Sequence, residues 1–431
     1  MEKLAIYGGP KVLEEILPRE WPGKHWIDHE EEEAVIRALH GDNEAANLAD
    51  RLKEFFDVPC ARAVNTGTGA LFTALAALDI GPGMEVIVPG FCWIPTFACV
   101  VSRGAIPVLV EVGEDLGVDP VDLEKKITDR TRAVIVVHMC GAPADMDPIM
   151  AIAEKHDLLV IEDCAQHVTG KYKGRYVGTI GDIGCFSMQQ NKHITTFMGG
   201  FMISRKEDLG TAISLAGDAG LGRSMGVVDP TLDVEARWGQ GRGIGRLARA
   251  MACVQLRKSP RILASLRRAH RRIKDGVGDI PGLRFRPLAN PEDEAGSFLI
   301  SYWPDEKTAA RAAEALKAEG VPEWIFHLQE YGAHMYYYQN ALVKKIGWTS
   351  GMGCPWDCPK NKGCEKYTYD KGSAPQSDEI FSRGVVMAVP SILTDEQSDR
   401  IAYAYRKVAS HLLGFAASDS ESEDQLASCA L

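Results

Sequence analysis

DLLVIEDCAQ, residues 157–166, joins four consecutive apolar side chains to two acids and a glutamine. An apolar run without strict alternation is typical of a strand that is buried on both faces, as in a parallel sheet between helices. Acids are almost never buried in such a place without a partner, so Glu162 and Asp163 indicate a bound group. Ligands of parallel sheets bind at the carboxyl ends of the strands, which is where these two acids lie.

Six further runs of the same kind surround this strand in the sequence. They are residues 62–65, 85–90, 106–112, 132–140, 183–188 and 200–204. Helical stretches separate several of them, as in GTGALFTALAALDIG (67–81), where apolar residues repeat at helical spacing. The alternation predicts an α/β fold with a large, mostly parallel sheet.

The length of 431 residues favours two domains. Residues 1–265 are predicted to form the large domain and residues 266–415 a smaller C-terminal α/β domain, while the acidic end, 416–431, is predicted to be disordered. A basic helix near 257–275 would bridge the two domains. The expected elements of the small domain are strands at 298–304 and 385–390, helices at 306–320 and 394–413, and a long irregular segment at 325–380.

The composition disfavours several classes of partner. The formal net charge is -11, and the one dense basic stretch, 257–274, repeats at helical spacing, so a solvated helix face is favoured over a nucleic-acid patch. No window reaches about 18 uninterrupted apolar residues, so no membrane span is expected. The start, MEKLAIYGGPKV, lacks the layout of a secretion signal, and a cytoplasmic location is predicted.

The eleven cysteines favour reduced thiols over a disulfide framework in such a chain. Three of them, Cys354, Cys358 and Cys364, cluster in CPWDCPKNKGC. They could supply three ligands of a zinc ion, but a fourth ligand is missing and the spacing is loose. No metal site is therefore assigned.

Two features other than the acids lie just beyond strand ends. NTGTGA (65–70) is a strand, a glycine turn and a helix start, so the N–H groups of Gly67 and Thr68 could form an anion nest that the helix dipole strengthens. Glycine turns before helices are often only turns. Trp93 follows the strand at 85–90 and offers a flat plate for stacking on a planar ring, although a core tryptophan is the commoner case.

Ser187 and Lys192 complete the set at the end of the strand 183–188. Ser187 can donate a hydrogen bond to a phosphate oxygen. Lys192 lies in QQNKHITTFMGG (189–200), where a surface loop lysine is the default interpretation. An amine in a half-buried site near an electron-poor cofactor can instead lose its proton and act as a Schiff-base nucleophile.

Together these are the parts that hold pyridoxal phosphate (PLP): a nest, a stacking plate, a carboxylate for the ring nitrogen, a phosphate serine and an imine lysine. The conjunction is far more specific than any one of its members. It predicts PLP as the cofactor.

The motifs TGTGAL, VIVPGFCWIPT, VIEDCAQ and YKGRYVGTIGDIGCFSMQQNKHIT resemble those of the DegT/DnrJ/EryC1/StrS family. Its members are PLP-dependent sugar and cyclitol aminotransferases of the aspartate-aminotransferase (type I) fold. The resemblance is close through 20–205 and looser from 239 to 415. It is strongest to glutamine:scyllo-inosose aminotransferases of aminocyclitol pathways, with aminohydroxybenzoate synthases nearby.

The resemblance implies a role for each residue of the set. Lys192 would form the Schiff base and move the proton, and Asp163 would pair with the ring nitrogen. Trp93 would stack on the ring and Gln166 would lie beside it. The residues that would hold the phosphate are Gly67, Thr68 and Ser187. The family works as homodimers whose sites are completed by the partner chain, so a homodimer is expected.

Two positions depart from the family pattern. Phe197-Met198 stands where relatives carry Gly-Glu or Gly-Asp before Gly-Gly. Gly241 stands at an asparagine of the segment that reaches the partner's phosphate, and the next residue, Arg242, could replace that contact by a charge-assisted one.

The leading hypothesis is an aminotransferase that moves an amino group, from glutamine or glutamate, to a ketocyclitol or keto-sugar. The alternative is another PLP reaction on the same scaffold: dehydration with aromatisation, epimerisation or an oxidative step. A third class is a non-enzymatic relative, which the intact set of lysine, aspartate and serine disfavours.

Overall fold

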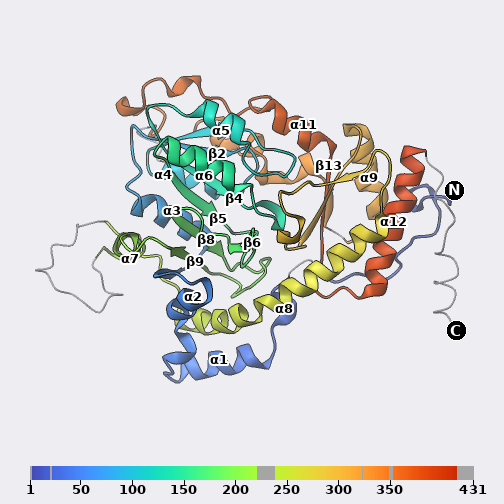
Figure 1. Cartoon of the computed structure of the whole chain (residues 1–431), viewed down its shortest axis with the longest axis horizontal. Coiled ribbons are helices and arrows are strands. Elements are labelled where there is room, and N and C mark those ends of the chain that lie inside the picture. Colours follow the sequence, from blue (N-terminus) through green and yellow to red (C-terminus); the bar gives the residue numbers. More distant parts are fainter. Residues whose placement is uncertain (1, 20–21, 221–237, 323, 349–352, 415–431) are drawn as a thin grey trace, which may run out of the picture.

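The computed structural model describes residues 2–19, 22–220, 238–322, 324–348 and 353–414. Two β-sheets form its framework, and one long helix runs along both of them (Figure 1). The acidic end that was predicted to be disordered lies outside the described residues. No helix in the described part of the chain is long and apolar enough to cross a membrane.

The larger sheet has seven strands in the order β1-β9-β8-β5-β4-β2-β3. The five strands from β8 to β3 are parallel, whereas β9 runs antiparallel to both of its neighbours. The prediction of a mostly parallel sheet is thus confirmed. The strands are β1 (Cys60–Val64), β2 (Glu85–Pro89), β3 (Ile106–Val110), β4 (Thr131–Val137), β5 (Leu159–Asp163), β8 (Ile183–Ser187) and β9 (Gly200–Ser204).

Helices cover both faces of this sheet, so its strands are buried on both sides. Successive side chains of a strand point to opposite faces, and Val134 and Ile135 of β4 accordingly lie in two different core clusters. This explains why the strands read as unbroken apolar runs. The helices are α2 (Leu48–Phe56), α3 (Gly67–Ala77), α4 (Pro95–Ser102), α5 (Pro120–Lys126), α6 (Met146–Lys155) and α7 (Leu209–Gly217); a small hairpin consists of β6 (Lys171–Tyr172) and β7 (Arg175–Tyr176).

The smaller sheet has four antiparallel strands in the order β10-β11-β13-β12. Most of the described part of the segment 325–380 forms short turns, as the irregular sequence predicts, and these turns pack against the β2–β3 end of the larger sheet, where Tyr369 donates to the carbonyl of Pro107 (2.6 Å) and Asn361 to that of Gly104 (2.9 Å). The elements are β10 (Arg284–Phe285), β11 (Phe298–Tyr302), α9 (Glu306–Ala318), β12 (Ile325–His327), α10 (Asn340–Val343), α11 (Pro375–Arg383), β13 (Gly384–Ala388) and α12 (Asp395–Leu413).

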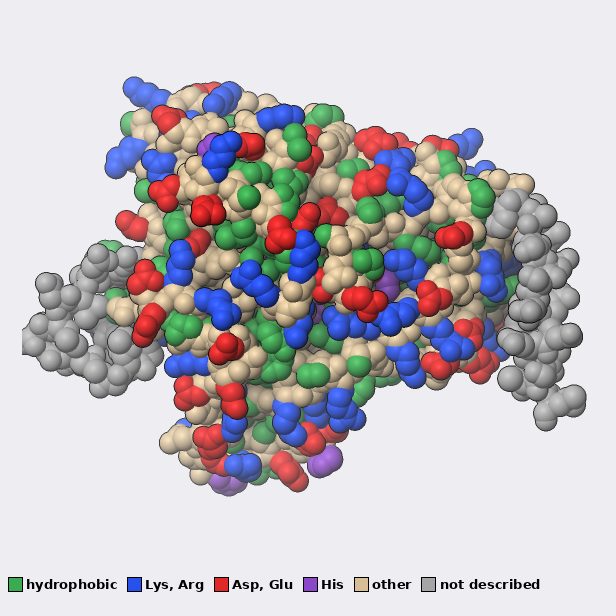
Figure 2. All heavy atoms as spheres, viewed as in Figure 1, with side chains coloured by type: hydrophobic (Ala, Val, Ile, Leu, Met, Phe, Trp, Pro, Cys, Tyr) green, Lys and Arg blue, Asp and Glu red, His purple; other side chains and the backbone are tan. Residues whose placement is uncertain are grey.

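Helix α8 (Arg246–Val277) links the two sheets and begins eleven residues earlier than the basic stretch suggested. Its first half packs on α1 (His29–Leu39) and its second half on α12. Acids of these neighbours pair with its basic side chains: the Arg257 guanidinium lies 2.8 Å from Glu30, and that of Arg272 lies 2.6 Å from Asp399. Figure 2 shows basic and acidic side chains intermixed over this face. The ion-paired helix face supports the solvated-surface interpretation over a nucleic-acid patch. The division into domains at residue 265 stays a prediction.

Candidate active site

A cavity of about 550 Å³ opens at the carboxyl ends of β4, β5 and β8. Val137, Asp163 and Ser187, the last residues of these three strands, all line it. Seven of the eight residues that were assigned to the cofactor line this one cavity: Gly67, Thr68, Trp93, Asp163, Gln166, Ser187 and Lys192. The strand-end argument therefore brought together side chains that lie up to 125 residues apart in the sequence.

Lys192 lies in the loop after β8, and the backbone of that loop is held from two sides. The Lys192 N–H donates to the carbonyl of Gln189 (3.0 Å), and the Lys192 carbonyl accepts from the N–H of Gly23 (3.0 Å). The next residue, His193, donates from Nδ1 to the Val168 carbonyl (3.1 Å) and accepts at Nε2 from the hydroxyl of Ser297 (3.0 Å). Burial lowers the pKa of the Lys192 amine, while the nearby carboxylate of Asp163 opposes that shift.

Asp163 ends β5 with its carboxyl group almost fully buried, 5% exposed. One oxygen accepts from the Thr96 hydroxyl (3.1 Å) and the other from the N–H of Ala165 (3.1 Å). No ion pair to Asp163 is formed within the described part of the chain. Burial raises the pKa of this carboxyl group, and the two hydrogen bonds and the nearby charge of Lys192 offset only part of that shift.

The N-terminus of α3 meets Ser187 at the floor of the cavity. The Thr66 hydroxyl caps the helix by accepting from the N–H of Gly69 (2.7 Å), and the first N–H groups of a helix have no partner within it. A Cβ at Gly67 would lie 2.7 Å from the Cβ of Ser187, so only glycine permits this approach. The result is a cradle of backbone N–H groups and one hydroxyl at the positive end of a helix dipole.

Trp93 and Gln166, which follow β2 and β5 in the sequence, also line the cavity. Trp93 is 48% exposed, so the interpretation as a core tryptophan is wrong. Gln166 is oriented by the N–H of Cys140, which donates to its Oε1 (3.1 Å). Both side chains contact His334, a residue of the irregular segment that sequence reasoning did not single out.

Arg242 is the one predicted residue that does not line the cavity. Its guanidinium lies 4.8 Å above the ring of Phe72, and its Nε donates to Gln240. The backbone of Arg242 is also tied down, because its carbonyl accepts from the N–H of Asn65 (2.8 Å). A role toward the partner chain's phosphate stays a prediction.

The model of the DegT/DnrJ/EryC1/StrS aminotransferase family matches residues 27–349, about three quarters of the chain. The chain belongs to this family.

Individual curated relatives match a smaller part of the chain than the family model does. An L-glutamine:2-deoxy-scyllo-inosose aminotransferase of Micromonospora echinospora is 36% identical over 214 residues, 47% of this chain and 51% of the relative. The chain thus spans about half the length of the curated relatives that it matches.

Solved structures share the whole fold. The aminotransferase of Psychrobacter cryohalolentis has a TM-score of 0.76 and 27% identity, covering 93% of this chain and 100% of that one. A Streptococcus pneumoniae protein solved in a PLP form has a TM-score of 0.73 at 20% identity, covering 92% of this chain and 100% of that one, which supports the fold alone. The α/β, type I fold expected from the sequence is confirmed.

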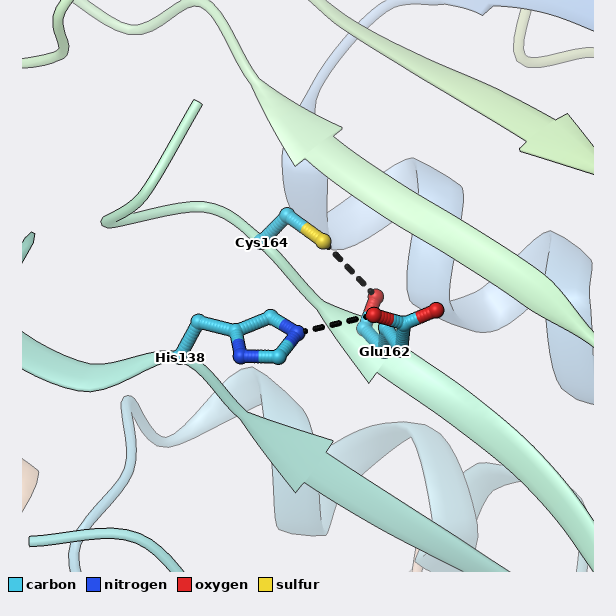
Figure 3. Close-up of side chains that lie close together, drawn as sticks. All are labelled: His138, Glu162 and Cys164. Atoms are coloured by element: carbon cyan, nitrogen blue, oxygen red, sulfur yellow. Dashed lines mark hydrogen bonds and ion pairs between the residues drawn. The ribbon is translucent and has the colours of Figure 1, made fainter. Parts of the chain in front are cut away.

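Three side chains at the ends of the neighbouring strands β4 and β5 come within metal-binding distance of one another: His138, Glu162 and Cys164 (Figure 3). The hydrogen bonds argue against a metal there. His138 accepts from the N–H of Ala144 at Nδ1 (3.1 Å), so its proton is on Nε2, which donates to Glu162 (2.9 Å). The nitrogen that faces the group therefore has no free lone pair for a metal.

Glu162 is instead saturated by donors. One oxygen accepts from the N–H groups of Ile180 (2.8 Å) and Gly181 (2.7 Å), and the other from His138 and the N–H of Gly178 (2.7 Å). The donors favour the ionised form, and the pKa of Glu162 is lowered although burial opposes this. Its carboxylate therefore fixes the loop before β8.

The sulfur atoms of the clustered cysteines are not brought together as a set of three ligands in the described residues. Cys354, Cys358 and Cys364 all belong to the described residues, and their three sulfur atoms do not gather within ligand distance of one another. The Cys364 thiol donates to the carbonyl of Trp356 (3.3 Å) instead. A zinc ion held by these three thiols is thus not supported.

Phe197, where the resemblance led us to expect glycine, has a φ of 62°, in the left-handed region. This conformation is costly for a bulky side chain. Phe197 and Met198 are 49% and 60% exposed, so burial within this chain compensates little of the cost. Met198 lines the cavity, which places the pair at its rim.

We predict that Lys192 in the apo protein titrates below the ordinary lysine value of about 10.4, because burial penalises the charged ammonium. Asp163→Asn should lower the pKa of Lys192 further, since the carboxylate is what raises it. The measurement is ¹³C NMR of the reductively methylated protein, with Lys192→Arg to assign the signal. A Lys192 signal that titrates with the bulk of the lysines, or rises in Asp163→Asn, would contradict the buried amine.

Glu162→Gln should lower the free energy of unfolding by about 2–5 kcal/mol, because an amide NH₂ would face two of the four donors. Urea denaturation measures this loss, with Glu33→Gln on the exposed face of α1 as the control. Added Zn²⁺ should not stabilise either the native protein or the variant. Stabilisation of the native protein by equimolar Zn²⁺ would instead restore the metal interpretation.

The free energy of unfolding of Phe197→Gly should exceed that of Phe197→Ala by about 1 kcal/mol, because only glycine adopts a positive φ without strain. The order should reverse at the neighbouring Met198, whose φ is not positive and where glycine normally costs about 0.4–1 kcal/mol. Thermal or urea unfolding of the four variants provides the comparison. Alanine being the more stable residue at both positions would show that Phe197 is unstrained.

Proposed function

We propose that the chain is a PLP-dependent aminotransferase that moves an amino group, from glutamine or glutamate, to a ketocyclitol or keto-sugar. The observation that carries this proposal is the cavity in which a buried amine, Lys192, and a buried carboxylate without a cation partner, Asp163, lie beside an N–H cradle. The family and the amino donor and acceptor in the relatives' names support the same reaction.

The residues fit PLP by charge as well as by shape. Asp163 lacks a cation partner in the described chain, and a protonated ring nitrogen would supply one. The cradle of Gly67, Thr68 and Ser187 suits a dianionic phosphate. When bound, PLP supplies an electrophilic carbon and an electron-withdrawing ring.

Each side chain then has a defined task. The Nζ of Lys192, with its lowered pKa, is a nucleophile when neutral and can take a proton from, and return it to, a substrate carbon. The carboxylate of Asp163 would accept a hydrogen bond from the ring N–H and hold that proton in place. Trp93 would stack on the ring, and Gln166 would lie beside it.

The proposal extends to assembly and location. The chain would act as a homodimer in the cytoplasm, with each site completed by the partner. Arg242, which lies outside the cavity of its own chain, would serve the partner's phosphate. Gel filtration with light scattering would detect the dimer. Arg242→Ala should weaken cofactor binding without altering the mass of the dimer measured in this way.

The test of the reaction is a half-reaction with glutamine alone. The purified protein should carry a visible absorption band that disappears on addition of glutamine, with release of one equivalent of the 2-oxo acid. Lys192→Ala should lower the rate of this step by at least about 10²–10⁴-fold, the range that acid–base catalysis supplies. The exposed Lys11→Ala is the matched control. A wild-type band that no amino donor bleaches would refute transamination.

A further inference from the structure

His334 is a half-buried residue of the cavity wall, and it follows the small-sheet strand β12 in the chain. It ends the short turn Gly332–His334 in the irregular segment after β12. The carbonyl of His334 accepts from the N–H of Cys92 (3.0 Å), which ties the turn to the loop after β2. The imidazole is thus held in the wall by its own backbone.

The hydrogen bonds of the ring determine its tautomer. Nδ1 lies 3.3 Å from the carbonyl of Tyr331, which can only accept, so Nδ1 carries a proton. Nε2 lies 3.2 Å from the amide nitrogen of Gln166. The Oε1 of Gln166 already accepts from Cys140, so the amide nitrogen faces His334 and donates to Nε2.

Only the neutral imidazole satisfies this arrangement. A second proton on Nε2 would place two donors against each other. Burial, and then the charge of Lys192, lower the pKa of His334 to about 3, which keeps Nε2 free to accept. A group with such a pKa is a poor acid or base near neutral pH, so a positioning role fits it better than a catalytic one.

The same ring packs at a tilt against two aromatic neighbours. Its centroid lies 4.9 Å from Trp93 at an interplanar angle of 42°, and 4.4 Å from Tyr331 at 32°. Trp93 is half exposed, so few other contacts restrict its indole. His334 is therefore in contact with both side chains that would flank the cofactor ring.

We propose that His334 is a positioning residue for the cofactor ring: its Nε2 fixes the amide of Gln166, and its ring fixes the plane of Trp93. This inference rests on the proposed function, because it assigns Gln166 and Trp93 to PLP.

Two variants separate the two contacts. His334→Gln keeps an acceptor near the position of Nε2 but removes the ring, whereas His334→Phe keeps a ring of similar size but removes the acceptor. The exposed His40→Gln is the control. Two properties are measured: the Kd of the apo protein for PLP, and the circular dichroism of the visible band of the bound cofactor, which reports how the ring is oriented.

We expect His334→Phe to raise the Kd for PLP about three- to tenfold, the loss of one buried hydrogen bond, while His334→Gln stays within about twofold of the native value. The dichroism of the bound cofactor should change most in His334→Gln, where Trp93 loses its stacking partner. Thermal midpoints of both variants should stay near that of His40→Gln.

Wild-type values of both properties in both variants would overturn the positioning role. So would equal changes in the two variants, because a merely structural disturbance would not distinguish acceptor from ring. Failure of the native protein itself to bind PLP would instead refute the proposed function, so the two failures can be told apart.

Discussion

The site depends on one constraint: two adjacent carboxylates at the end of a buried strand must each find a partner. Successive side chains of β5 point to opposite faces of the sheet. Glu162 meets four donors on one face and has a lowered pKa, whereas Asp163 meets one hydroxyl and one N–H on the other and has a raised pKa. A carboxyl group is thus fully hydrogen-bonded within the fold on one face, whereas on the other face it can still accept a further donor or cation.

Contacts between the two sheets lie close to Asp163 and the cavity. The N–H of Ala295 donates to the carbonyl of Gly141 (2.7 Å), and the hydroxyl of Ser297, just before β11, donates to His193 next to the candidate lysine. His334 makes a third connection through Gln166. Because the contacts of Ser297 with His193 and of His334 with Gln166 lie in the cavity wall, a shift of these residues would alter the positions of Lys192 and Gln166 directly.

Much of this was predictable because the physical cause lies within a few residues. Strands such as β2 and β5 are unbroken apolar runs, and the strand-end rule collected Asp163, Ser187 and Lys192 without knowledge of the contacts. His334 was not predictable in this way. It lies in a segment without periodicity, and its partner Gln166 is 168 residues away. The strand pattern alone could not rank Glu162 against Asp163, which the family resemblance did, because the facing loops are what distinguish the two carboxyl groups physically.

Phe197 is the clearest conflict between local preference and the fold. A residue with a positive φ and a half-exposed aromatic ring gains little from its own chain, so the strain has to be compensated by a contact outside it or by function. Met198 beside it is more exposed still and borders the cavity. Phe197 and Met198 together form an exposed apolar surface at the rim of the cavity. The strain at Phe197 therefore concerns the rim of the cavity, whereas Lys192 and Asp163 lie buried inside it.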